Sequence, residues 1–150
     1  GLLPYGEIRD MEAGSPTLTY NTIGRHVSCL VRTKVVSKLS PWLARTDLGA
    51  VHTVAVSHGE GRFVAGPEQL RIMAQNGQIA TQYVDLEGKP TYDIRFNPNG
   101  STDAIEGITS PDGRVFGKMG HSERIGAHLY KNVPGVKDQK IFEAGVEYFK

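Results

Sequence analysis

The chain has 150 residues and a formal net charge of +1, with 39% apolar and 22% charged residues. This length favours one domain, and the composition is that of an ordinary globular protein. The small net charge argues against a nucleic-acid-binding surface, and no apolar run approaches the ~18 residues that a membrane span requires. Cys29 is the one cysteine, so no internal disulfide can form, and we expect a cytoplasmic protein.

The first part of the chain predicts a helix end followed by strands. Residues 1–6 begin with apolar side chains and contain Pro4, which is typical of the last turn of a helix. Because the chain opens in this way without an initiator methionine, we expect a fragment or a processed chain. Residues 18–20 and 26–36 predict strands. In the second strand, Cys29 falls on the apolar face, where we expect a small buried side chain rather than a reactive thiol.

A polar loop follows the next strand. Residues 40–43 predict a helical turn with Trp42 as a core anchor, and residues 51–56 predict a buried strand. This strand leads into residues 57–63, which place His58, Glu60 and Arg62 around two glycines. Loops at the carboxyl ends of strands in α/β sheets often bind ligands, so this loop is a candidate ligand site. The alternative is a tight turn with solvated charges.

The middle of the chain predicts a helix, a strand and a second polar loop. Pro67 suits the first helical position and Gly77 suits the cap, so we expect a helix over residues 67–75. A strand follows at residues 78–84. The loop at residues 97–101 is rigid and polar, and it is either ordinary loop chemistry or a source of amide groups for a ligand. The last element is an amphipathic helix over residues 138–149.

Residues 110–124 predict a turn, a strand and a polar cluster at the end of the strand. Pro111 suits the second position of a type I turn, and residues 115–119 form the apolar strand. Residues i and i+2 of an extended backbone project to the same side, so His121 and Glu123 should point together. This arrangement suits a catalytic base and the acid that orients it.

Other interpretations of this pair remain open. A metal site would need two further ligands, and no spacing in the sequence recommends any. A solvated surface His–Glu pair needs no function at all. A self-contained hydrolase would use Ser122 or Ser57 as the nucleophile, but neither lies on a G-x-S-x-G elbow.

Three blocks of sequence carry a resemblance to a known family. They are residues 58–63 (HGEGRF), residues 97–101 (NPNGS) and residues 108–124 (ITSPDGRVFGKMGHSER). Together they resemble the glutamine amidotransferase domain of phosphoribosylformylglycinamidine synthase, over essentially all 150 residues. The resemblance implies the C-terminal part of a flavodoxin-like α/β domain of the triad class (class I). We therefore expect a mixed sheet with flanking helices, without the N-terminal parallel strands, and residues 1–150 as a partial glutaminase domain.

The resemblance also implies a reaction and its partners. In the family, a cysteine attacks glutamine, glutamate is released, and ammonia passes to a synthetase domain. That domain uses ATP and magnesium to convert formylglycinamide ribonucleotide to the amidine. Carried onto this chain, His121 is the general base and acid, and Glu123 orients it. The remaining candidates line the glutamine pocket or face the synthetase domain, and they are His58, Glu60, Arg62, Asn97 and Asn99.

The chain also departs from the family. Gly120 and Ser122 stand where the family often has proline, which reduces the rigidity of the backbone around His121. The nucleophilic cysteine is absent, so we expect the isolated chain to lack glutaminase activity and to carry no metal or cofactor of its own. We also expect an exposed sheet edge and apolar face that permit self-association. A non-catalytic remnant that packs against the synthetase is the remaining alternative.

Overall fold

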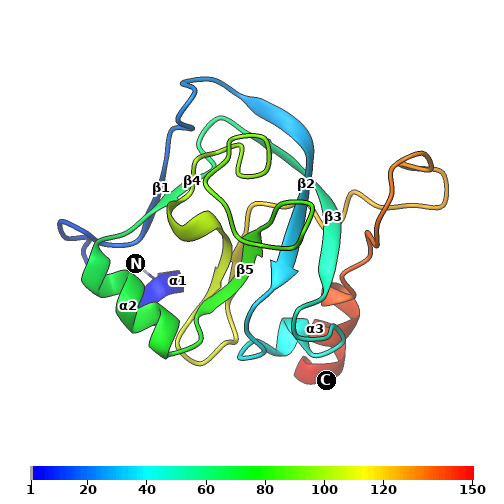
Figure 1. Ribbon diagram of the computed structural model, residues 1–150. Coiled ribbons are helices and arrows are strands. Elements are labelled where there is room, and N and C mark those ends of the chain that lie inside the picture. Colours follow the sequence, from blue (N-terminus) through cyan, green and yellow to red (C-terminus); the bar gives the residue numbers. More distant parts are fainter. Residues whose placement is uncertain (1) are drawn as a thin grey trace.

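The computed structural model describes residues 2–150, so Gly1, which belongs to the predicted N-terminal helix end, lies outside the described part. The strands occupy the middle of the molecule, with α2 on one side and α3 on the other (Figure 1). The helices are α1 (Leu2–Tyr5), α2 (Pro67–Gln75) and α3 (Ile141–Phe149), and 3₁₀ turns lie at Pro41–Leu43 and Thr102–Ala104. The strands are β1 (Thr17–Thr19), β2 (Val27–Val35), β3 (Val51–His58), β4 (Arg62–Val64), β5 (Ile79–Tyr83), β6 (Ile105–Thr109) and β7 (Phe116–Lys118).

The strands form a five-stranded sheet in the order β3-β2-β5-β6-β7 and a two-stranded ribbon of β1 and β4. The combination of this sheet with packed helices confirms the predicted α/β class. Every pairing between the described strands is antiparallel, however, so the expected mixture of strand directions is not seen. The rule that ligands bind at the carboxyl ends of parallel strands therefore does not apply to the loop after β3.

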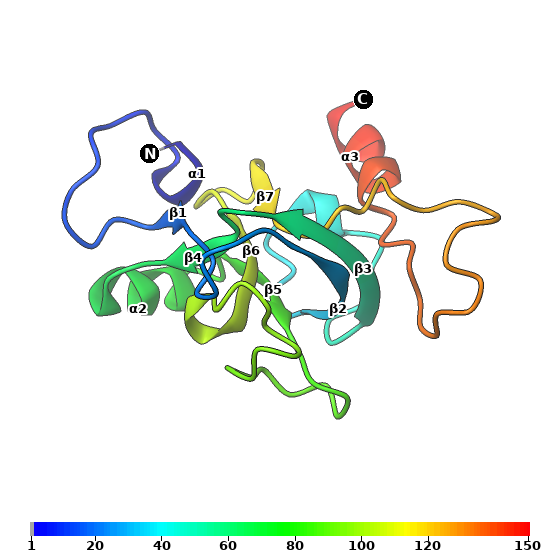
Figure 2. The same cartoon turned by 90° about the horizontal axis from the view of Figure 1, so that it is seen from above.

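The sheet curls until its two edges meet. The amide of His121, three residues beyond β7, donates a hydrogen bond of 2.8 Å to the carbonyl of Ala55 in β3. Just before it, the amide of Met119 donates to the carbonyl of Glu106 in β6. The segment after β7 thus crosses from β6 to β3, and Figure 2 shows β3 curving toward β7. His121 lies at this seam.

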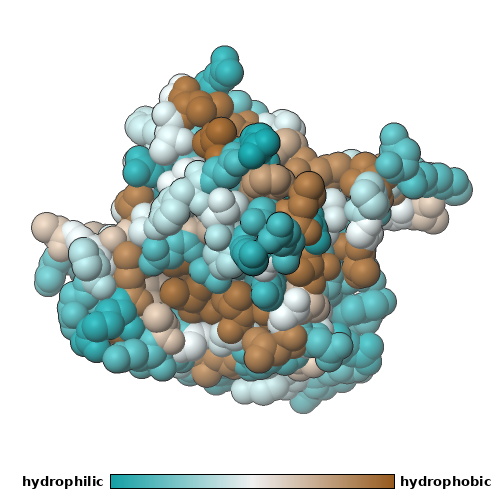
Figure 3. All heavy atoms as spheres, viewed as in Figure 1, coloured by the Kyte–Doolittle hydropathy of each residue, from teal (hydrophilic) through white to brown (hydrophobic). Residues whose placement is uncertain are grey.

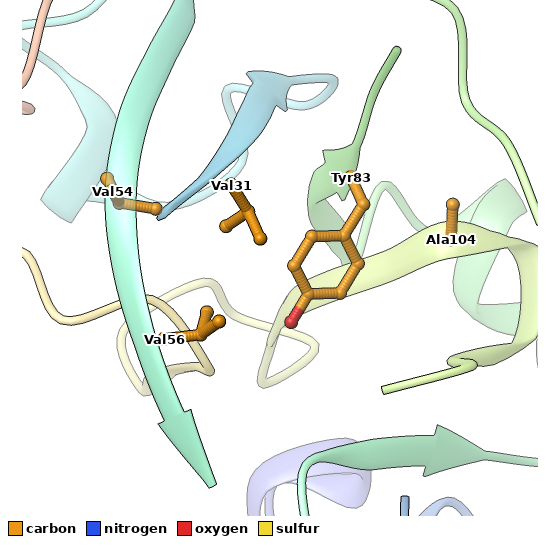
Figure 4. Close-up of a cluster of buried hydrophobic side chains, with 5 residues drawn as sticks. All are labelled: Val31, Val54, Val56, Tyr83 and Ala104. Carbon is orange, nitrogen blue, oxygen red and sulfur yellow. The ribbon is translucent and has the colours of Figure 1, made fainter. Parts of the chain in front are cut away.

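The core consists of three groups of buried apolar side chains. One fills the inside of the curled sheet, where the fully buried ring of Tyr83 lies between the valines of β2 and β3 and Ala104 (Figure 4). A second joins β2 to the start of α3 through Val35 and Ile141. The third packs α2 onto β6 through Met73 and Ile108. Removal of this apolar surface from water is the main force that holds the helices on the sheet.

Most predicted elements are present within a few residues of their expected bounds. The helix at residues 67–75 is confirmed at both ends, whereas α3 begins at Ile141 rather than at Asp138. The prediction for Cys29 is wrong, because this residue is exposed. Among the described strands, the first half of β2 pairs only with β3, and β5 joins on the other side only at residues 33–35, so the core covers only the second half of the strand.

The surface also carries apolar side chains. Brown residues form several patches among teal ones on the face seen in Figure 3. Several large apolar residues of α3 are also exposed, namely Phe142, Val146, Tyr148 and Phe149. Self-association through such a surface stays a prediction. None of the helices within residues 2–150 has the length and apolar character needed to cross a membrane.

Candidate functional site

The predicted His–Glu pair is formed. Nδ1 of His121 lies 2.7 Å from Oε1 of Glu123, and the side chains are 25% and 56% exposed. The strand ends at Lys118, so the two side chains meet across the turn that follows rather than along an extended strand. Partial burial raises the pKa of Glu123, but its own backbone amide and His121 outweigh this effect, so the pKa lies below its usual value. The carboxylate therefore stays ionised near neutral pH, as an orienting acid must.

The second ring nitrogen of His121 has no hydrogen-bond partner within residues 2–150. This atom, Nε2, is buried. With Nδ1 facing the carboxylate, the proton on the ring belongs on Nδ1, and the lone pair of Nε2 is left to accept a proton from another group. This is the arrangement that a general base in a triad needs.

His58 is the residue of the predicted ligand loop that lies beside this pair. Its ring stacks on that of His121, with centroids 5.1 Å apart and planes inclined by 9°. Its Nε2–H donates to the carbonyl of Met119, which fixes the tautomer. Burial lowers the pKa of His58, the hydrogen bond to Met119 opposes this, and the charge of nearby His121 lowers it further. The ring is therefore neutral near pH 7 and packs as a flat, uncharged surface.

A cavity of about 350 Å³ opens beside the pair. Glu60 is not among the residues that line it and is exposed, and Arg62 instead donates to the carbonyl of Gly100 at 3.3 Å. The structure thus brings together only one of the three charged or ionisable residues of the loop with His121. The cavity is lined by His58, residues 116–123, Ile141 and Phe142.

Asn97 and Asn99 do not line the cavity beside His121, and their side chains do not lie on the surface. Both are fully buried, so neither side chain is open to a ligand or to a partner domain in this structure. The side chain of Asn97 closes its own loop by bonds to the backbone of Ser101, and that of Asn99 donates to Oδ1 of Asn21 at 2.8 Å. Asn21 in turn donates to the carbonyl of His58 at 2.7 Å. Asn99 therefore supports the His58 loop through Asn21, whereas Asn97 stabilises its own loop.

The two serines considered as nucleophiles are bonded elsewhere. Ser57 Oγ lies 3.0 Å from the ring nitrogen Nε2 of His26, and Ser122 is buried with its hydroxyl bonded to Gln139. Neither hydroxyl is bonded to His121, which argues against the self-contained serine hydrolase. Within residues 2–150 no cluster of three or more His, Cys, Asp or Glu side chains is suited to a metal ion.

Sequence reasoning missed two residues beneath the site. Glu106 in β6 is buried, the side chain of Lys118 in β7 is only 9% exposed, and the two charged groups lie 3.3 Å apart, next to the backbone that carries His121. The signal was present, because each is a charged residue within an otherwise apolar strand. Charged side chains are rarely buried unless they are paired, so two such strands suggest a partner for each.

Comparisons with known proteins show the family of the chain. Residues 1–149 match the family described as the CobB/CobQ-like glutamine amidotransferase domain. The subunit PurQ of phosphoribosylformylglycinamidine synthase from Synechocystis sp. is 34% identical over 137 residues, which cover 91% of this chain and 55% of that protein. The PurQ subunit from Chlorobaculum parvum is 36% identical over 122 residues, which cover 81% of this chain and 46% of that protein.

A solved structure shows the same fold. The structure of PurLQS from Thermotoga maritima superposes with a TM-score of 0.65 at 24% sequence identity, over 91% of this chain and 54% of the matched chain. This likeness confirms the predicted fold. The chain spans about half the length of these two PurQ subunits and of the matched chain of PurLQS.

Proposed function

Since the chain belongs to the family of CobB/CobQ-like glutamine amidotransferase domains, we propose that it forms part of the glutaminase of a phosphoribosylformylglycinamidine synthase. In this reaction glutamine is hydrolysed to glutamate, and the ammonia is delivered to a synthetase partner. The synthetase uses ATP and magnesium to convert formylglycinamide ribonucleotide to the amidine in purine biosynthesis. The family match and the names of the relatives support this assignment. We also propose that the protein acts in the cytoplasm.

The observation that carries the proposal is the free Nε2 of His121 opposite a carboxylate-bound Nδ1. In the proposed mechanism Nε2 accepts the proton of a cysteine thiol, and the thiolate attacks the carboxamide carbon of glutamine. The C–N bond then breaks, and the same nitrogen returns the proton to the leaving ammonia. Water hydrolyses the thioester with His121 again as the base, and Glu123 keeps the ring oriented throughout.

Cys29 does not supply that thiol. It is exposed in the first half of β2, and desolvation by its neighbours raises the pKa of its thiol, which disfavours the thiolate that attacks. It also lies within a strand rather than on a strand-to-helix turn. We therefore assign the nucleophile to a part of the glutaminase outside these 150 residues.

The test uses the complete enzyme with either glutamine or ammonia as the nitrogen donor. His121→Asn should lower glutamine-dependent amidine formation by on the order of 10²–10⁴-fold, the usual contribution of a general acid–base. Ammonia-dependent formation should be unchanged, because ammonia needs no glutaminase. His128→Asn is the matched control, since His128 is an exposed histidine of the same loop. If both activities of His121→Asn persist, the pair is structural and the chain is a non-catalytic remnant that packs against the synthetase.

A further inference from the structure

A buried ion pair lies directly beneath the candidate site. Lys118 Nζ is 3.3 Å from Oε1 of Glu106, and the side chains are 9% and 0% exposed. Moving two charges out of water carries a desolvation penalty that their attraction often fails to offset. The pair therefore calls for an explanation other than stability.

Both charges hold the residue that precedes His121. The amide of Gly120 donates to Oε1 of Glu106 at 2.5 Å, and the carbonyl of Gly120 accepts from Nζ of Lys118 at 3.0 Å. The donor and the acceptor of one residue are thus bonded to the two members of the pair. Bonds to charged groups are stronger than bonds between neutral groups.

The same lysine also holds the residue that follows His121. Nζ donates to the hydroxyl of Ser122 at 3.0 Å and to Oε1 of Gln139 at 2.9 Å. Gln139 lies two residues before α3 and accepts from Ser122 as well. The ammonium group of Lys118 is therefore bonded to the backbone of the residue before His121 and to the side chain of the residue after it.

The fit around Gly120 is tight. A Cβ atom there would lie 2.7 Å from Cγ2 of Val54, 2.8 Å from Oε1 of Glu106 and 3.0 Å from Nζ of Lys118. Glycine and serine restrict the backbone little by themselves, so the order of this segment has to come from its surroundings.

We propose that the Glu106–Lys118 pair is a positioning device that holds the residues on both sides of His121, through the backbone of Gly120 and the hydroxyl of Ser122, and so aims its imidazole at Glu123. The pair touches no reacting atom, so both members are positioning residues. The consequence for catalysis rests on the proposed function, whereas the positioning itself does not.

The test separates positioning from stability by removing both charges together. Glu106→Leu with Lys118→Met replaces the pair by apolar side chains, a change that is often neutral or stabilising for buried ion pairs. The fold should therefore be retained while the bonds to Gly120 and Ser122 are lost. Neutralising the exposed pair Glu68 and Arg71 by E68Q and R71Q is the control.

Nuclear magnetic resonance of the isotope-labelled protein supplies the readouts. In the double variant, hydrogen exchange at the Gly120 amide should accelerate by about tenfold to a hundredfold, as loss of a bond to a charged acceptor implies. The ring ¹⁵N signals of His121 should shift from those of a ring bonded through Nδ1–H toward those of a mixture of tautomers. Neither readout should move in the control.

The proposal is overturned if the folded double variant keeps the exchange rate of Gly120 and the ring signals of His121. Should the double variant not fold, Lys118→Arg takes its place, because it keeps the charge while its planar head group cannot reproduce the bonds of an ammonium. Unchanged ring signals in that variant would also overturn the proposal.

A kinetic measurement in the complete enzyme adds the catalytic consequence. The double variant should lower kcat with glutamine, leave KM for glutamine nearly unchanged and spare the ammonia-dependent reaction. If the ring signals shift but His121→Asn leaves glutamine-dependent turnover intact, the positioning role stands and the proposed function fails.

Discussion

The imidazole ring of His58 lies flat on that of His121, at 5.1 Å between centroids and 9° between planes. The two residues come from opposite edges of the curled sheet, His58 from the end of β3 and His121 from the segment after β7. The bond from His58 to the carbonyl of Met119 ties the first ring to the segment that carries the second. The stack therefore joins the two edges of the sheet at the place where the candidate base lies.

Substitutions of His58 separate the two contacts that this ring makes. His58→Phe keeps a flat ring on His121 and loses the bond to Met119, whereas His58→Ala loses both. We expect His58→Ala to lower the free energy of unfolding by ~1–3 kcal/mol and His58→Phe to lower it by less. Urea denaturation of the two variants measures the difference. Equal losses would show that the stack contributes nothing beyond the hydrogen bond.

Gly61 and Gly59 flank the same glutamate but should respond differently to substitution. A Cβ at Gly61 would lie 1.9 Å from Nδ2 of the buried Asn99, whereas a Cβ at Gly59 would meet no atom of the described residues within 4 Å. Gly61→Ala should therefore cost ~1–3 kcal/mol of stability through overpacking. Gly59→Ala should be nearly neutral. Thermal unfolding of the two variants measures the difference. A neutral Gly61→Ala would mean that the Asn99 brace moves away at no cost.

The elements that sequence predicts well are those with local signals. The helix α2 follows from Pro67 at its start and Gly77 after its end, which act within a few residues. The exposure of Cys29 could not be predicted in this way, because alternation reports which side chains share a face and not how far neighbouring strands extend. That extent depends on β5, about fifty residues along the chain.

In the candidate site, too, contacts between residues close in sequence are predictable, whereas contacts between distant residues are not. His121 and Glu123 are two residues apart, so their pairing follows from local backbone geometry. The pairing of Glu106 with Lys118 depends on the register of β6 and β7, in which Gly107 faces Lys118. The brace formed by Asn99 and Asn21 joins residues that are 78 positions apart. The resemblance marks the motif that contains Asn99, but only the fold shows that the motif supports the loop.

The isolated chain of 150 residues should release no ammonia from glutamine. The proposed base and its orienting acid are present, but the one cysteine is exposed in a strand and does not suit nucleophilic attack. A coupled glutamate assay on the purified chain measures this. If hydrolysis is seen and Cys29→Ser abolishes it, the assignment of the nucleophile to another segment is wrong.

The stability of the protein should fall as the pH drops from 7 toward 5. Burial lowers the pKa of His52 below its usual value of 6.5, Lys118 lowers it further, and Asp138 opposes this. The unfolded state therefore binds more protons below about pH 6.5, so the free energy of unfolding decreases there and is fully present above it. His58 acts with the same sign. Carboxylates with lowered pKa values, such as Glu123, act only below about pH 4.5.

His52→Leu should flatten this dependence between pH 7 and pH 5, because it removes a titrating group that is buried with Nδ1 unpartnered among the described residues. Urea denaturation at a series of pH values gives the slope. His128→Leu alters an exposed histidine and should leave the slope as it is. A wild-type slope in His52→Leu would show that other groups set the dependence.

Gly145→Ala should destabilise the protein, although alanine normally stabilises a helix by ~0.5–1 kcal/mol relative to glycine. A Cβ at Gly145 would lie 2.2 Å from Cζ3 of Trp42, whose ring also packs on Phe149 with centroids 5.5 Å apart. Trp42 cannot retreat easily, because its Nε1 donates to the carbonyl of Arg114 at 2.8 Å. The added methyl group therefore has to push α3 away from the 3₁₀ turn that carries the tryptophan.

We expect this displacement to cost ~1–3 kcal/mol, which outweighs the gain in helix propensity. Trp42 is the one tryptophan of the chain, so a change in its fluorescence reports the docking of α3 directly. Val146→Ala is the control, since the side chain of Val146 is 58% exposed. Because Ile141 and Phe142 line the cavity beside His121, undocking of α3 should also alter the environment of that ring. A Gly145→Ala variant that is more stable than the wild type would show that α3 does not pack on Trp42 in solution.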